Sequence, residues 1–286
     1  MTRGVAPFAA LVTHALDDLA RLLSGKRLCV LTGAGVSTDS GIPDYRGPVT
    51  RLKPRNPIQH RAFVTDPATR ARYWARSVLG WPRFRDFAPN PAHHSLAAMQ
   101  RAGAVTSLIT QNVDRLHHKA GSRDAIELHG ALHEARCLDC GALEDRDALQ
   151  ERLLAMNPGA DRWSHRLAPD GDADLDPSHI AGFRVPGCVA CGGVLKPDVV
   201  FFGDNVPKPR VERAFAALDA ADALLVAGSS LTVYSGYRFA LRAQSRGIPV
   251  AVVNLGEGRA DAIAAVKVDA PVGEVLPALA ERVSPR

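Results

Sequence analysis

Cysteines give this sequence its plainest chemical signal. Four of the five form two C-x-x-C-G motifs, Cys137-Leu138-Asp139-Cys140-Gly141 and Cys188-Val189-Ala190-Cys191-Gly192. The glycine after each second cysteine permits a tight turn that directs backbone amides at the thiolates. Four thiolates complete the tetrahedral coordination of zinc and leave no position for water. The sequence therefore predicts one structural Zn²⁺, bound by Cys137, Cys140, Cys188 and Cys191.

Four unliganded thiols and a redox pair are the alternative interpretations of these cysteines, but two matched motifs favour metal. The 47 residues between the motifs exceed the usual spacing of a zinc ribbon, so we expect the metal to fix an elaborated insert. The fifth cysteine, Cys29, lies in an apolar run and is expected to belong to the core.

A glycine-rich turn, Gly33-Ala34-Gly35-Val36-Ser37, follows an apolar run. Such a turn lets the backbone approach a pyrophosphate at a helix N-terminus. Thr38 replaces the third glycine of the dehydrogenase fingerprint, and no acidic residue follows about 20 residues later to hold a ribose, so hydride transfer is disfavoured. The next segment, Ser40 to Gly47, carries Asp44 and Arg46 between glycines and is expected to be a functional loop.

Two further segments carry polar side chains that could act in catalysis. Thr110-Gln111-Asn112-Val113-Asp114 follows a second apolar run, and Glu127-Leu128-His129-Gly130 places a histidine before a glycine. Taken singly, His129 is more often a structural or surface histidine than a base, because His117, His118 and His133 are equally prominent among ten histidines. Only the set of motifs together singles it out.

Four short apolar runs predict buried parallel strands that would bring these residues together. They are Arg27 to Thr32, Val105 to Thr110, Ala223 to Ala227 and Pro249 to Asn254. Gly228-Ser229-Ser230 follows the third run and precedes a helical stretch from Tyr234 to Gln244. Alternating strand, glycine-rich turn and helix are typical of a doubly wound sheet, which binds ligands at the carboxyl ends of its strands. The predicted fold class is α/β with a Rossmann-like parallel sheet.

Two segments do not fit that sheet. Residues from about 48 to 101 are rich in Pro and Arg, with helical pieces at Pro67 to Val78 and Ala92 to Arg101, and predict a smaller helical module. Residues from about 137 to 194 form the zinc-binding insert, which is loop-like from Ala160 to Asp176. The Rossmann-like core would then comprise about 24–47, 102–136 and 195–286, in a single catalytic domain spanning 1–286.

Composition limits the class of protein. A hydrophobic content of 46% suffices for a buried core, and neither a secretory signal nor a run of roughly 20 apolar residues is present. Cysteines in metal-binding spacing fit a reducing compartment, so we expect a cytoplasmic protein without membrane contact. The charge of +5 is concentrated between Arg46 and Arg85, where Asp66 is the one acidic residue. A solvated helical surface explains this stretch somewhat better than a nucleic-acid site.

Together these motifs resemble those of the sirtuins, a family of NAD-dependent protein-lysine deacylases. Phe202-Gly203-Asp204 and Asn254-Leu255-Gly256 complete the set, and the motifs occur in family order from about residue 24 to the C-terminus. The similarity extends to the class II sirtuins, including the mitochondrial four-type subgroup and its bacterial relatives. It rests on Tyr73-Trp74-Ala75-Arg76, Gly80-Trp81-Pro82, Pro89-Asn90-Pro91-Ala92-His93, Leu195-Lys196-Pro197-Asp198-Val199-Val200 and Tyr234-Ser235-Gly236-Tyr237-Arg238.

The resemblance assigns a role to each motif. It implies that His129 is the catalytic base, assisted by Asn112 and Asp114. The implied NAD contacts are Gly33, Ala34, Gly35, Ser37, Thr38, Asp44, Tyr45, Arg46, Gln111, Asn112, Val113, Asp114, Gly228, Ser229, Ser230, Asn254, Leu255, Gly256 and Val272. An extended acyl-lysine peptide would add as a strand. It would lie between two segments that supply Val200, Phe201, Phe202 and Gly203 on one side and Leu231 and Val233 on the other.

The implied reaction yields free lysine, nicotinamide and O-acyl-ADP-ribose. The acyl oxygen attacks the ribose carbon as nicotinamide leaves, and His129 then removes a proton from a ribose hydroxyl. Family members that prefer acidic acyl groups carry Tyr-x-x-Arg where this chain has Leu52-x-x-Arg55, so succinyl or malonyl preference is disfavoured. Asp204 stands where the family usually has glutamate, which bears on peptide preference.

Two rival functions remain. Protein mono-ADP-ribosylation would use the same fold, with a protein nucleophile attacking the same ribose carbon. A zinc-ribbon protein that binds nucleic acid through Arg46 to Arg85 is the more distant alternative, because it leaves the glycine-rich turns and the Gln111 to Asp114 segment unexplained. The acyl group, the substrate proteins and the oligomeric state are not specified by the sequence.

Overall fold

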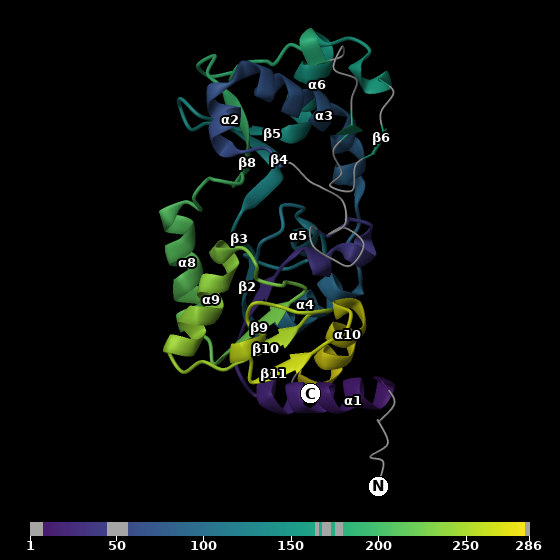
Figure 1. Ribbon diagram of the computed structural model, residues 1–286, viewed down its shortest axis with the longest axis vertical. Helices are drawn as coiled ribbons and strands as arrows, with labels where there is room; N and C mark the ends of the chain where they lie inside the picture. Colours follow the sequence, from purple (N-terminus) through teal and green to yellow (C-terminus); the bar gives the residue numbers. More distant parts are fainter. Residues whose placement is uncertain (1–7, 45–56, 164–165, 168–172, 175–179, 284–286) are drawn as a thin grey trace.

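A computed structural model describes residues 8–44, 57–163, 166–167, 173–174 and 180–283. Figure 1 shows a sheet flanked by helices, with a second group of helices and short strands stacked above it. The sheet is parallel, with strand order β11-β10-β9-β1-β2-β3. Its strands are β1 (Leu28–Thr32), β2 (Val105–Thr110), β3 (Ile126–Glu127), β9 (Ala223–Ala227), β10 (Val250–Val253) and β11 (Val266–Val268). The predicted α/β fold and its four apolar strands are confirmed.

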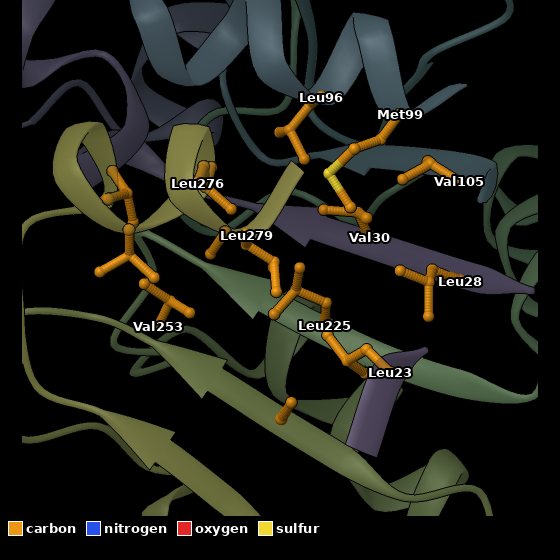
Figure 2. Close-up of a cluster of buried hydrophobic side chains, with 14 of the residues drawn as sticks. Leu23, Leu28, Val30, Leu96, Met99, Val105, Leu225, Val253, Leu276 and Leu279 are labelled. Atoms are coloured by element: carbon orange, nitrogen blue, oxygen red, sulfur yellow. The ribbon is translucent and has the colours of Figure 1, made fainter. Parts of the chain in front are cut away.

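Helices cover both faces of this sheet, as expected for parallel strands that are buried on both sides. One face packs on α1 (Phe8–Leu23), α4 (Pro91–Arg101) and α10 (Val272–Val283). Figure 2 shows that cluster, in which Leu96 and Met99 of α4 meet Val30 of β1, and Leu276 and Leu279 of α10 lie beside them. The opposite face packs on α8 (Lys208–Asp219) and α9 (Tyr234–Ser245).

The upper group of elements combines the zinc-binding insert with part of the helical module (Figure 1). It contains α2 (His60–Thr65), α3 (Pro67–Asp86), α6 (Arg146–Met156) and an antiparallel sheet of order β5-β4-β8. These strands are β4 (Gly130–Cys137), β5 (Leu143–Asp145) and β8 (Leu195–Val199). One buried cluster joins them, with Phe63 and Trp74 packed beside Cys137, Leu149 and Cys188. The two segments therefore share a single core.

Local sequence explains where these helices begin. Asp66 precedes α3 and accepts hydrogen bonds from the N–H groups of Ala68 and Thr69, and Pro67 occupies the first helical position. Asn90 caps α4 in the same way. The sequence predicts that Ala92 to Arg101 belongs to the helical module. The structure instead packs α4 on the parallel sheet, because Ala92, Leu96 and Met99 belong to the core of that sheet.

Segment 157–184, which follows α6, is closed by hydrogen bonds between its two ends. The side chain of Asn157 is buried there and accepts the Arg184 N–H through Oδ1 at 2.8 Å. Its Nδ2 donates to the Arg184 carbonyl at 2.7 Å. The side-chain amide of Asn157 thus joins the two ends of this segment. Within it the described elements are η3 (Ala160–Arg162), β6 (Arg166–Leu167) and β7 (Ala173–Asp174).

The remaining elements are short. They are η1 (Ala34–Val36), η2 (Thr38–Ser40), α5 (Leu116–Lys119) and η4 (Asp261–Ile263). No helix within the described ranges is long and apolar enough to cross a membrane.

Candidate active site and metal centre

Two glycine turns meet at the carboxyl edge of the sheet. The strand order changes direction between β1 and β9, and such a switch point opens a crevice for ligands. Gly33 and Gly35 follow β1, and Gly228, in the left-handed region at φ 64°, follows β9. A Cβ on Gly33 would lie 2.7 Å from Cβ of Ser229, and one on Gly35 would lie 2.9 Å from Cα of Gly228. Only glycine allows the two turns to pack so closely.

The segment after β2 is tied to both turns. Asn112 Nδ2 donates to the Gly33 carbonyl at 3.1 Å and to Ser37 Oγ at 3.0 Å. Ser37 Oγ in turn donates to Asp114 Oδ2 at 2.7 Å. Gln111 Nε2 donates to Ser229 Oγ at 2.7 Å. These bonds connect side chains that were predicted separately from three strand ends, and the structure brings them together at one edge.

His129 lies immediately before β4 and beside this network. Its Nδ1 is 2.9 Å from the Gln111 carbonyl oxygen, and its Nε2 is 2.8 Å from Ser235 Oγ. Burial lowers the pKa of His129 to about 4, so the ring is neutral at neutral pH. Because a carbonyl oxygen only accepts hydrogen bonds, Nδ1 carries the proton and Nε2 keeps its lone pair. The imidazole can therefore accept a proton at Nε2.

Buried titratable groups surround the first turn. The rings of His93 and His117 lie 4.8 Å apart. His93 Nε2 is 3.5 Å from Ser37 Oγ, and His117 Nε2 is 2.9 Å from Thr32 Oγ1. Burial lowers the pKa of His93 to about 4 and that of His117 well below its usual range. Burial also raises the pKa of Asp114, against hydrogen bonds from the Leu116 N–H and the Ser37 hydroxyl. Burial thus disfavours the charged forms of all three side chains around the turn.

The burial of His93, His117 and His129 predicts that the folded protein is less stable in acid. Because the pKa values of His93, His117 and His129 are lower in the folded protein than the ordinary value near 6.5, the unfolded chain binds more protons as the pH falls below 6.5. The free energy of unfolding should fall by about 2 kcal/mol for each of His93 and His129 between pH 7 and pH 5, and His117 acts in the same sense. His118 and His133, whose pKa values burial also lowers, add to this fall, whereas Asp114 and Glu127, whose pKa values burial raises, act in the opposite sense. Urea denaturation at successive pH values measures the slope.

A free energy of unfolding that stays constant down to pH 5 would contradict the assignment of buried neutral imidazoles.

The predicted NAD contacts that follow β10 lie at the same edge. Asn254 follows β10, is buried, and donates from Nδ2 to the Leu255 carbonyl at 3.1 Å. Leu255 and Gly256 are exposed beside it. Val272 begins α10 and is buried in the cluster that contains Val36. Asp44 is half-buried at the end of the first loop. Four residues singled out from the sequence fall outside the described ranges, namely Tyr45, Arg46, Leu52 and Arg55.

The predicted peptide segments flank His129. The N–H of Val200 donates to the His129 carbonyl at 2.8 Å, which places the chain after β8 beside the histidine. The exposed side chains of Phe202 and Val233 come from the two segments, while Leu231 is buried with a φ of 51°. Phe201 instead packs its ring 5.2 Å from that of Phe63, so its side chain belongs to the core of the upper group.

Asp204 is held by two basic side chains. Its Oδ2 lies 3.1 Å from His60 Nδ1 and 3.7 Å from Lys196 Nζ. The shortened side chain at this position therefore has partners within the protein.

The four paired cysteines form the predicted cluster. Their Sγ atoms all lie within 4.8 Å of one another, with 3.5 Å between Cys137 and Cys191 and 3.8 Å between Cys140 and Cys188. Four sulfurs at about 2.3 Å from one zinc ion stand about 3.8 Å apart at tetrahedral corners, so the observed spacing fits zinc. Backbone N–H groups of Cys140 and Ala190 point at the sulfurs of Cys137 and Cys188.

The metal centre and His129 stand at opposite ends of one strand. β4 begins at Gly130 and ends at Cys137. Eight residues of extended strand span roughly 25 Å, which excludes direct contact between the metal and the histidine. The cysteine cluster is therefore structural with respect to this site.

Ser235 is a contact of the site that was assigned no role from the sequence, although it lies in the motif Tyr234-Ser235-Gly236-Tyr237-Arg238. It lies in the first turn of α9, 106 residues from His129. His93 and His117 likewise reach the glycine-rich turn only through the packing of α4 and α5 against β1. Spacing along the chain carries no signal for any of these contacts.

The two glycine turns and the polar side chains beside them fit a dinucleotide. Glycine at positions 33, 35 and 228 lets two turns meet at the carboxyl edge of the sheet, which is where such sheets bind dinucleotides. Hydroxyl and amide groups of Ser229 and Asn254 stand at the strand ends, where ribose and base can be hydrogen-bonded.

Comparison with known proteins finds similarity over nearly the whole chain. A family model described as Sir2 family matches residues 33–235. NAD-dependent protein deacetylase 1 of Mycobacterium avium (strain 104) is 52% identical over 273 residues, covering 94% of this chain and 95% of that protein. Human mitochondrial NAD-dependent protein lipoamidase sirtuin-4 is 49% identical over 266 residues, covering 92% and 85%. A solved Sir2 structure with a p53 peptide and NAD⁺ aligns with a TM-score of 0.74 at 31% identity, covering 93% and 97%.

Proposed function

This chain belongs to the Sir2 family and is an NAD-dependent protein deacylase with a structural zinc site, and on that premise we propose that His129 is its general base. The observation that carries the proposal is the hydrogen bonding of His129. Nδ1–H is committed to the Gln111 carbonyl, so the lone pair of Nε2 is available to a substrate hydroxyl. A neutral imidazole with a lone pair on Nε2, which in this structure faces the Ser235 hydroxyl, is the form that a base must have.

The other site residues serve binding and orientation. When bound, NAD supplies the ADP-ribosyl group that accepts the acyl oxygen and releases nicotinamide. We assign Gln111, Asn112 and Asp114 to the nicotinamide riboside end, because their side chains bond to the two glycine turns and the carbonyl of Gln111 binds His129. The turns at Gly33 and Gly228 are assigned to the phosphates. Asn112 and Ser37 hold the first turn in place, so that the reacting groups are positioned before chemistry begins.

We assign the substrate peptide to the gap between the segment after β8 and the segment before α9. The backbone of Val200 is bonded to the His129 carbonyl, so a peptide strand added there would present its lysine beside the histidine. Phe202 and Val233 expose apolar surface on the two sides of this gap and would cover the acyl chain from water. We place this reaction in the cytoplasm, where thiolate ligands stay reduced.

The acyl preference follows from Leu52-x-x-Arg55, which stands where family members that prefer acidic acyl groups carry Tyr-x-x-Arg. Relatives of this chain are named deacetylases and lipoamidases, both of which remove uncharged acyl groups. We expect nicotinamide release to be at least tenfold faster with acetyl-lysine or lipoyl-lysine peptides than with the succinyl peptide of the same sequence. A carboxylate without a paired cation in the acyl pocket costs at least the 1.4 kcal/mol that a tenfold rate difference represents.

A panel of four peptides that differ only in acyl group tests this expectation, with acetyl, lipoyl, a long saturated chain and succinyl compared by kcat/KM. Succinyl as the best substrate would show that the acyl preference is assigned wrongly. NAD labelled in the adenine separates deacylation from the rival reaction. Label recovered in O-acyl-ADP-ribose supports the proposal, whereas label retained on protein would indicate ADP-ribosyl transfer.

A further inference from the structure

The two ring nitrogens of His129 are held by different parts of the fold. Nδ1 donates to the backbone carbonyl of Gln111, which follows β2. Nε2 lies 2.8 Å from Ser235 Oγ, in the first turn of α9. Because Nδ1 already carries the single proton of the neutral ring, the Ser235 hydroxyl must be the donor to Nε2. The lone pair assigned to catalysis therefore has a hydrogen-bond donor of its own.

The position of Ser235 in α9 does not require a hydroxyl. Val233 precedes the helix, and no side chain caps this end. The backbone carbonyl of Ser235 accepts from Arg238 Nε at 3.0 Å, a contact that any residue could make. The side chain is half-buried and turned toward His129. The hydroxyl of Ser235 thus hydrogen-bonds to the imidazole and is not needed to form the helix.

Gly236, the residue after Ser235, determines the position of Gln111, which is the partner of His129 Nδ1. A Cβ on Gly236 would lie 2.4 Å from Gln111 Oε1, so glycine lets the Gln111 side chain rest on the helix backbone. There Gln111 Nε2 reaches Ser229 Oγ. The Gln111 residue held in this way is the one whose carbonyl binds Nδ1 of His129. One helical turn therefore acts on both sides of the ring, directly through Ser235 and indirectly through Gly236.

We propose that Ser235 is a positioning residue for His129, which holds the imidazole by its Nε2 lone pair until the substrate hydroxyl takes its place. This inference rests on the proposed role of His129 as the base. With both nitrogens engaged, rotation of the ring about its Cβ–Cγ bond would break two hydrogen bonds in a buried site. The ring is thereby kept in the one tautomer and orientation that directs a lone pair at the substrate.

Ser235→Ala tests the proposal, since it removes one oxygen from a half-buried position. We expect kcat for deacylation to fall about tenfold, the effect of losing one orienting hydrogen bond. KM for NAD and for the acyl peptide should change by less than about twofold, because the hydroxyl acts on the base and not on binding. Ser245→Ala is the matched control, since Ser245 is exposed at the other end of α9 and donates to the Arg242 carbonyl. It should leave kcat and both KM values unchanged.

A spectroscopic measurement distinguishes positioning from a general structural role. In protein labelled with ¹⁵N-histidine, the His129 signals are those missing from the His129→Ala spectrum. In Ser235→Ala the unprotonated Nε2 should shift toward the position of a free lone pair, while Nδ1 stays protonated. An unchanged Nε2 signal together with unchanged kcat would overturn the role of Ser235 while leaving the role of His129 intact. An active His129→Ala variant would instead refute the proposed base, and this inference with it.

Discussion

His129→Ala is expected to lower kcat for deacylation by about 10²- to 10⁴-fold, the contribution typical of a general base. The variant removes the one imidazole whose Nε2 lone pair is presented beside the assigned peptide segment. Steps that precede the base should survive, so exchange of labelled nicotinamide into NAD, driven by the acyl peptide, should remain measurable. Single-turnover measurements of nicotinamide release and of O-acyl-ADP-ribose formation would separate the two steps.

His133 provides the matched control, because it is a second partly buried histidine and lies in β4, four residues after His129. Its ring lies edge-on to Trp81 at 5.1 Å, and neither ring nitrogen has a hydrogen-bond partner among the described residues. His133→Phe keeps an aromatic ring there and should retain activity. Both variants should bind one zinc ion per chain, since neither residue is in the cysteine cluster. Full activity of His129→Ala would refute the assignment of the base.

Loss of zinc is expected to produce the largest change in stability. Structural zinc contributes on the order of 10 kcal/mol to small zinc-binding folds, and here two of its ligands, Cys137 and Cys188, are packed in the core of the upper group. Cys188→Ser or chelation should therefore unfold that group and lower Tm by more than about 10 °C. Activity should be lost in parallel, because β4 connects the cluster to His129.

Tryptophan fluorescence measures this unfolding selectively. The chain has three tryptophans, and Trp74, Trp81 and Trp163 all belong to α3 or to the insert. Metal removal should shift their emission to the red while far-UV circular dichroism still reports helices on the parallel sheet. Cys29→Ala is the control, because Cys29 lies in β1 outside the cluster and should leave the zinc content unchanged. A metal-free protein with an unchanged Tm and emission spectrum would contradict a stabilising role.

Strong local signals made much of this molecule predictable. The runs that became β1, β2, β9 and β10 are apolar because parallel strands covered on both faces bury nearly all their side chains, with Thr106 and Ser107 of β2 the exceptions. The cysteines carry their ligand spacing in the sequence itself. Glycines at 33, 35 and 228 mark positions where backbone meets backbone. Each of these features is determined within a few neighbouring residues.

The rest depends on contacts between distant segments. β3 and β11 have two and three residues, which is too short for a recognisable period. β8 reads Leu-Lys-Pro-Asp-Val, and its proline and charges conceal a strand that pairs with β4. The apolar residues of α4 are spaced as in any amphipathic helix, so the sequence gives no indication that they pack on the sheet. The bond from Ser235 to His129 exists only once α9 has packed against the end of β2.

Segment 157–184, which is closed by Asn157 and Arg184, bears on how this protein can evolve and be engineered. Both ends of segment 157–184 are fixed at one point, and Ala160, Trp163 and Phe183 near those ends pack in the core of the upper group. An insertion that leaves these three residues in place costs mainly loop closure, and doubling a loop costs only about 0.6 kcal/mol. Insertions and deletions between residues 163 and 183 should therefore accumulate among homologues more readily than elsewhere in the insert. The same position is suited to grafting an epitope or a reporter domain without altering the metal ligands or the catalytic edge.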